Sequence, residues 1–290
     1  MTAAEVIVVM ALALATVFLL AMFLPRQRES ARLAGCRQNL MQIGKAVALY
    51  DPARGTLPAV KLGERGPLGS LLVELSVADF RALDLDTPRE RRGTSRELSE
   101  RTVPGFVCLS DRNALGGIHP AAISYRAATG DESDGRNGAF APGRQTRFSD
   151  IEAADGTGYT ALFSERLVGD GRPAERTPWN YALVGSPVAG PACNDAPSAT
   201  WRGDAGSSWT RADWRSTLYN HAVLPNAPTS CVADDGKTAL MGASSSHAEG
   251  VNVLFADLSV RTFTPRIDSK IWREWAKLGD LPAAAPKSSP

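Results

Sequence analysis

Residues 5–24 read EVIVVMALALATVFLLAMFL. A single acidic residue, Glu5, precedes an apolar run from Val6 to Leu24. A helix of that length rises about 28 Å, which is close to the hydrocarbon thickness of a bilayer. The sequence therefore predicts a transmembrane helix that holds the chain in the inner (cytoplasmic) membrane by a single pass, with membrane lipid as its partner.

The segment after Pro25 predicts that the helix continues with one apolar face. Apolar side chains recur at alternating spacings of three and four, which places them on one helical stripe. The stripe consists of Leu33, Cys36, Leu40, Ile43, Val47 and Tyr50. We therefore expect residues 1–50 to form one transmembrane and stalk helix, half in lipid and half packed on a globular domain.

Three interpretations of the N-terminus differ in what happens to this helix. A cleaved secretory signal is disfavoured, because Met1–Ala4 contains no Lys or Arg and no small-residue cleavage pattern precedes Pro25. A static anchor and an assembly helix both stay open. The assembly interpretation rests on Glu5, since a carboxylate at the edge of a lipid-embedded helix usually has a partner or a function.

Thr2, Glu5 and the apolar run resemble the mature start of type IV pilins and secretion pseudopilins. The sequence departs from that pattern at Met1, where the family usually has Phe, and it shows no short basic leader ending in Gly. The resemblance implies that Glu5 takes part in helix assembly, where it would neutralise the N-terminal amine of a neighbouring subunit.

Five further blocks occur in the order seen in one large bacterial family. They are CRQNLMQIG at 36–44, FVCLSD at 106–111, SDIEAADGT at 149–157, NAPTSC at 226–231 and SHAEGVNVLFAD at 246–257. Together they resemble a planctomycete-type family of uncharacterised proteins that carry a pilin-like methylation segment and are similar to pseudopilin G of type II secretion. The family pattern singles out Asn39, Asp111, Asp155, His247, Asn252 and Asp257.

A β-hairpin is the clearest local prediction. Val251, Val253 and Phe255 share one face of a strand, and Val260 begins a return strand. Leu258 stands where a two-residue turn normally has Gly, so we expect a longer or bulged turn. Further strands are predicted at 122–127, 160–165 and 239–241, separated by segments rich in Gly and Pro.

The expected fold class is α+β and type IV pilin-like, with the long N-terminal helix on an antiparallel β-sheet and a large loop-rich insertion. The expected division is a helix at 1–50, a globular pseudopilin-like domain at 51–282 and a disordered tail at 283–290. Family resemblance contributes to this prediction, because periodicity alone does not specify it.

The four cysteines favour an oxidising compartment. Cys193 and Cys231 flank one loop-rich segment and are the favoured pair, followed by Cys36 with Cys108. Four cysteines allow three pairings, and the sequence does not choose among them.

Topology is contested by the charges beside the apolar run. Four arginines follow it, and the positive-inside rule would keep that side in the cytoplasm. Disulfide formation and the family resemblance favour the opposite orientation, so we expect an extracytoplasmic globular domain. The arginines are Arg26, Arg28, Arg32 and Arg37.

Composition and motif spacing argue against several functions. A formal net charge of +1 offers no basic surface for nucleic acid. The three histidines lack metal-ligand spacing, and a hydrolase built from a serine of the run 244–246, His247 and Asp257 has no G-x-S-x-G elbow. Asp131 and Asp134 lie in an acidic loop that could hold calcium, although its spacing is not that of an EF-hand. We therefore expect no catalytic residues, no enzyme activity and no cofactor, with calcium as the weak exception.

The sequence thus predicts a membrane-anchored, pseudopilin-like structural or assembly protein of the cell envelope, which associates with itself or with other pseudopilin-like subunits. The alternative is a membrane-tethered extracytoplasmic binding module for a peptide or carbohydrate, with residues 170–238 as its contact surface. In that alternative, tryptophan rings could stack on a sugar. These are Trp179, Trp201, Trp209 and Trp214.

Overall fold

The computed structural model describes residues 2–75 and 100–279, with the backbone alone at 19–26 and 191. The helices are α1 (Ala3–Arg54), α2 (Pro67–Ser70), η3 (Pro104–Phe106), α4 (Arg112–Leu115), α5 (Phe148–Ala154), α6 (Gly190–Asn194), η4 (Ser198–Thr200) and α7 (Ser269–Glu274). The strands are β1 (Tyr125–Ala128), β2 (Ala161–Glu165), β3 (Tyr181–Val184), β4 (Trp201–Arg202), β5 (Leu218–Tyr219), β6 (Cys231–Ala233), β7 (Ala239–Leu240), β8 (Val251–Phe255) and β9 (Val260–Phe263). The predicted tail at 283–290 lies outside the described residues.

Both ends of α1 are capped by its own residues. Thr2 and Glu5 form a capping box, in which each side chain accepts a hydrogen bond from the other residue's backbone N–H. At the other end, Gly55 adopts φ 76°, a left-handed conformation that Gly takes without strain. The helix therefore extends four residues beyond the boundary expected at residue 50.

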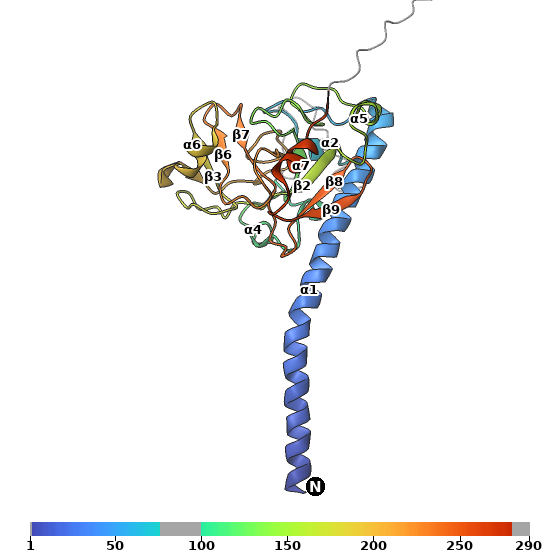
Figure 1. The fold of residues 1–290 in the computed structure, drawn as a ribbon, viewed down its shortest axis with the longest axis vertical. Coiled ribbons are helices and arrows are strands. Elements are labelled where there is room, and N and C mark those ends of the chain that lie inside the picture. The colour runs from blue at the N-terminus through green and yellow to red at the C-terminus, as the bar shows by residue number, and fades with distance from the viewer. Residues whose placement is uncertain (1, 76–99, 280–290) are drawn as a thin grey trace, which may run out of the picture.

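The C-terminal half of α1 packs on the globular part while the N-terminal half projects away from it (Figure 1). The predicted apolar stripe is confirmed: Cys36, Leu40 and Val47 are fully buried, and Ile43 is 1% exposed. Gly44 lies against Leu254 of β8, where an added Cβ would come within 3.0 Å of the leucine side chain. The glycine thus allows the helix and the strand to approach closely.

Two mixed sheets form the globular part. The first has the strand order β5-β1-β2-β8-β9, in which β1 pairs with β5 in parallel and all other pairs are antiparallel. The second has the order β4-β3-β6-β7 and contains the parallel pair β3–β6. The predicted loop-rich insertion therefore supplies a sheet of its own, on the left in Figure 1.

The expected fold class needs correction. The fold is α+β, but its sheets are mixed rather than antiparallel, because long connections return β5 beside β1 and β6 beside β3 in the same direction. The pilin-like architecture was therefore a wrong expectation.

The predicted membrane span was also wrong. In the described parts of the chain, none of the helices has an apolar stretch long enough to cross a membrane, which contradicts the single-pass inner-membrane location.

The predicted hairpin is present and its turn is longer than two residues. Leu254 pairs with Val260, and the Phe255 N–H donates to the Ser259 carbonyl over 2.9 Å. Leu258 adopts φ 65°, the left-handed conformation expected where a three-residue turn ends in a bulge. The Leu258 side chain lies beside Gly44 of α1, so packing on the helix offsets the strained backbone.

We predict that Leu40→Ala lowers the free energy of unfolding by about 2–5 kcal/mol, because it opens a cavity between α1 and the sheets. Leu49, on the same helix, is 60% exposed and provides the matched control. Leu49→Ala should change the free energy by no more than about 0.5 kcal/mol. Denaturant unfolding of both variants tests this prediction, and equal losses would show that the stripe does not anchor the helix.

Candidate functional site

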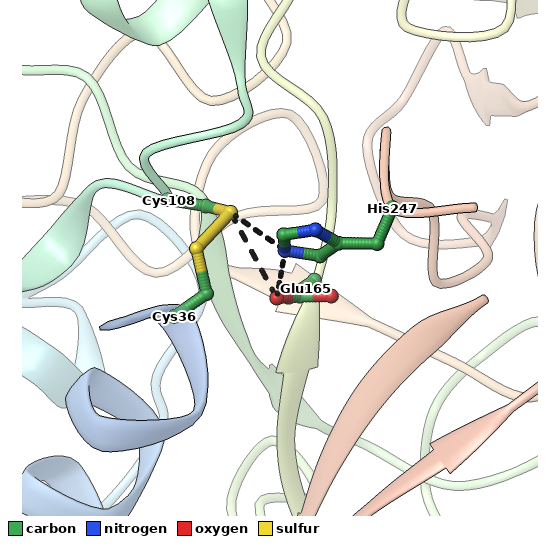
Figure 2. Close-up of side chains that lie close together, drawn as sticks. All are labelled: Cys36, Cys108, Glu165 and His247. Carbon is green, nitrogen blue, oxygen red and sulfur yellow. Dashed lines mark hydrogen bonds and ion pairs between the residues drawn. A yellow bond between two sulfur atoms is a disulfide. The ribbon is translucent and has the colours of Figure 1, made fainter. Parts of the chain in front are cut away.

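A buried cluster lies where α1 meets β2 and the segment before β8. Cys36 of α1 is disulfide-bonded to Cys108, with a Cα–Cα distance of 5.1 Å. Figure 2 shows the His247 ring directed at Cys108 and the Glu165 carboxylate beside both. One donor atom from each of these four residues lies within 4.8 Å of all the others, and all four residues are buried.

His247 lies between two carboxylates. Its Nδ1–H donates to Glu29 Oε1 over 2.7 Å, and its Nε2 lies 3.5 Å from Glu165 Oε1 and 3.3 Å from Cys108 Sγ. Burial disfavours the charged imidazolium, but the hydrogen bonds and charges of Glu165 and Glu29 outweigh it and raise the pKa of His247. Ser110 Oγ donates to Glu29 as well, over 2.9 Å, and so helps to fix its carboxylate.

Asn252 of β8 orients the Glu165 carboxylate. Its backbone N–H donates to Oε2 and its Nδ2 donates to Oε1, both over 2.9 Å. Asn252 Oδ1 in turn accepts hydrogen bonds from Arg37 Nε over 3.2 Å and from Thr262 Oγ1 over 2.7 Å. The carboxylate is therefore held by a residue whose own amide orientation is fixed.

The structure distributes the other family-pattern residues around the fold. Asn39 donates from α1 to the Val107 carbonyl over 3.2 Å and stays near the cluster. Asp111 caps α4 and accepts from the Val168 N–H over 2.9 Å; burial raises the pKa of its carboxyl. Asp155 accepts from the Gly279 N–H, and Asp257 forms an ion pair with Arg261 over 2.9 Å.

The hydrolase interpretation finds no support in this geometry. The ring nitrogens of His247 face Glu29, Glu165 and the disulfide. The Asp257 carboxylate accepts hydrogen bonds from Arg261 and from the Ser259 N–H instead. The space lined by Cys108, Glu165 and neighbouring residues is too small for a water molecule. As folded, the cluster holds groups in place and offers no room for a substrate.

The residues of two ligand hypotheses have other partners or positions in this structure. Of the calcium candidates, Asp131 forms an ion pair with Arg273 over 2.8 Å and accepts from Asn137 Nδ2, while Asp134 pairs with Arg136. Three of the four tryptophans proposed for stacking on sugars have their rings in the core. Trp201, Trp209 and Trp214 are at most 1% exposed.

Both predicted disulfides are formed. Besides Cys36–Cys108, the structure bonds Cys193 of α6 to Cys231 of β6, with a Cα–Cα distance of 5.5 Å. The second bond ties α6 to β6, an inner strand of the four-stranded sheet. It lies in a separate hydrophobic cluster with Trp201, away from His247.

Sequence reasoning missed Glu165 of the cluster and two residues that contact it or its neighbours. Glu165 is the acidic end of a strand that begins with three apolar residues, ALFSE, and that contrast was the available signal. Glu29 lies seven residues before Cys36, which puts both on one face of α1. Arg37 was considered for membrane topology, yet it donates to Asn252 and Thr262.

His221, in contrast, lies in an aromatic cluster away from the site. Its ring stacks on Trp272 with centroids 3.6 Å apart. Nδ1–H donates to the Trp272 carbonyl over 2.6 Å, and Nε2 accepts from the Tyr219 hydroxyl over 3.1 Å. Burial lowers the pKa of His221 to about 3, because a second proton would be enclosed without a partner.

We predict that His221 makes the protein less stable as the pH falls below about 6.5, because the unfolded chain then binds a proton that the folded chain excludes. Between pH 8 and pH 5 this contribution is about 2 kcal/mol. The unfolding free energy of the wild type should fall by that amount relative to His221→Gln, whose other titrating groups are the same. Parallel pH curves for the two proteins would contradict the prediction.

Comparison with known families gives one match. Residues 79–270 match the family described as protein of unknown function (DUF1559). None of the curated proteins and none of the solved structures match this chain. The matched residues include Glu165, His247 and Asn252 but not α1, so the resemblance of the N-terminus to a pilin methylation segment receives no support from the match. Because the match covers more than half of the sequence, the chain belongs to the DUF1559 family of uncharacterised proteins.

Proposed function

We propose that this chain is a non-catalytic assembly protein whose subunits associate through the N-terminal part of α1. The observation that supports this is a run of exposed apolar side chains between Val6 and Phe18. They lie on the half of α1 that projects from the globular part (Figure 1). Each of the large apolar side chains of this run is at least 42% exposed. They are Val6, Ile7, Val8, Val9, Met10, Leu12, Leu14, Val17 and Phe18.

The arrangement of these side chains favours several partners rather than one groove. Consecutive helical residues point about 100° apart, so Val6–Met10 face every direction around the axis. A helix that is apolar all round is buried on all sides in its working state. The same segments of other copies of this chain can bury it on all sides, because each presents the same apolar side chains and is itself stabilised by their burial.

The energetics favour the same conclusion. Burying one Val, Leu or Phe side chain stabilises association by about 1.5–3 kcal/mol. The capping box of Thr2 and Glu5 completes the start of the helix within the chain, so the segment is helical before it meets a partner.

Crosslinking of the full-length oxidised chain tests the proposal. Leu12→Cys, treated with a short bis-maleimide, should give covalent dimers and larger species on a denaturing gel. The matched control is Leu49→Cys, which lies on the same helix at a similarly exposed leucine of the packed half. Equal crosslinking of the two variants, or none in either, would overturn the proposal.

A cleft favours ligand binding as the second candidate function. It has a volume of about 910 Å³ and lies between the 134–144 loop and the loops that follow β3 and join β6 to β7. Its lining carries both signs of charge, with Arg136, Arg144 and Lys237 beside Asp134 and Asp235. This mixture suits a charged peptide. A chain that stays monomeric and binds peptides, with loss of binding in Lys237→Glu, would favour this candidate over assembly.

A further inference from the structure

We propose that the cluster around Cys36 is a zinc site in the reduced protein, with Cys36, Cys108, Glu165 and His247 as the four ligands. The residue types match those that zinc prefers in closed structural sites: thiolate sulfur, imidazole nitrogen and carboxylate oxygen. All four are buried, as a structural rather than catalytic site requires. This inference is independent of the assembly proposal.

The distances between donor atoms support the assignment. Zinc bonds of about 2.0–2.3 Å in a tetrahedron put neighbouring ligand atoms about 3.3–3.8 Å apart. Cys108 Sγ lies 3.3 Å from His247 Nε2 and 3.9 Å from Glu165 Oε1, and these last two atoms are 3.5 Å apart. Two of these three distances lie within the range expected for a zinc tetrahedron before any metal binds, and the third is 0.1 Å longer.

The surroundings of the ligands are those of a metal site. A zinc-bound histidine characteristically donates its second ring N–H to a carboxylate, and His247 does so to Glu29 while leaving Nε2 directed at the sulfur (Figure 2). Asn252 holds the Glu165 carboxylate at both oxygens. The Leu109 N–H donates to Cys36 Sγ over 3.2 Å, which stabilises a thiolate there.

The disulfide leaves one contact of this arrangement without a donor. Glu165 Oε1 accepts from Asn252 Nδ2 and lies 3.5 Å from His247 Nε2. The Cys108 sulfur, 3.9 Å from the same oxygen, carries no hydrogen while it is disulfide-bonded and donates nothing to it. Replacing the sulfur–sulfur bond with a cation would bring a positive charge to the buried carboxylate and to both sulfurs. Cys36 and Cys108 would thus be linked in two alternative ways, by a disulfide in oxidising conditions and through a shared zinc ion in reducing conditions.

The chemistry of the exchange balances. A phosphine reductant gives two electrons to the sulfur–sulfur bond and takes the oxygen of one water, whose two protons go to Cys36 and Cys108. Zinc then displaces both thiol protons and any proton on His247 Nε2, and these protons go to the buffer. An oxidant that removes two electrons restores the disulfide and releases the metal.

Metal analysis of the full-length chain tests the proposal. After reduction with a phosphine, dialysis against zinc and removal of excess metal, the protein should hold one zinc per chain, and the oxidised protein none. Cys36→Ser and His247→Gln should each bind zinc at least 10-fold more weakly. Glu29→Gln should keep the stoichiometry and lose about 10–100-fold in affinity, as expected for a residue that orients a ligand.

Matched controls separate this site from adventitious binding. Reduction also frees Cys193 and Cys231, so the double variant Cys193→Ser/Cys231→Ser should still bind one zinc. His221→Gln should do the same. A reduced chain without zinc, or zinc that is lost in the Cys193/Cys231 variant and kept in Cys36→Ser, would overturn the proposal.

Cobalt provides a readout on the wild-type chain, which does not depend on whether a variant folds. Reduced protein loaded with Co²⁺ should show the intense visible absorption of a tetrahedral site together with sulfur-to-cobalt charge-transfer bands. A weak octahedral spectrum without charge transfer would contradict the assignment.

Discussion

The packing of the α1 stripe on β8 and β2 is the constraint on which the rest of this structure depends. Leu40, Ile43 and Val47 enter the same core cluster as Leu162 and Leu254 from the central strands of the five-stranded sheet. Gly44 permits that approach and Leu258 covers it from the hairpin turn. Because one helix supplies a continuous wall of the core, the globular part cannot be complete without the C-terminal half of α1.

The same helix brings charge into the interior, and the fold neutralises it by pairing. Glu29 reaches His247, and Arg37 reaches Asn252, which in turn holds Glu165. A carboxylate buried without such partners would cost several kcal/mol. The apolar stripe and the polar cluster therefore specify the same docking of the helix, one through shape and the other through a fixed set of donors and acceptors.

Local periodicity was sufficient to predict the elements that define this core. The spacing of Leu33–Val47 identified the buried face of the helix, and the alternation of Val251, Val253 and Phe255 identified the central strand. Leu258 in place of Gly indicated the bulged turn. Parallel pairing of β1 with β5 and of β3 with β6 could not be predicted, because it depends on where long connections return, and no local pattern records that.

The site was predictable only in part for a similar reason. The sequence singled out Cys36, Cys108, His247 and Asn252 one by one, but their meeting is a property of the fold. Glu165 and Glu29 were missed because a lone carboxylate in a strand or helix does not reveal whether it faces water or a buried ring. The apolar run, in turn, was interpreted by its length alone, and that interpretation proved wrong for the helix that the structure describes.

The unbroken course of α1 from Ala3 to Arg54 has a mechanical consequence. A helix of that length is a rod of about 78 Å, and it transmits a pull or a twist from its free end to the domain. Such a load acts in shear on the side chains that α1 packs against the globular part. The Cys36–Cys108 disulfide links α1 covalently to the segment between η3 and α4, and so resists that displacement. While this disulfide is formed, a force on the free end of α1 cannot separate the helix from the globular part unless the backbone or the disulfide breaks.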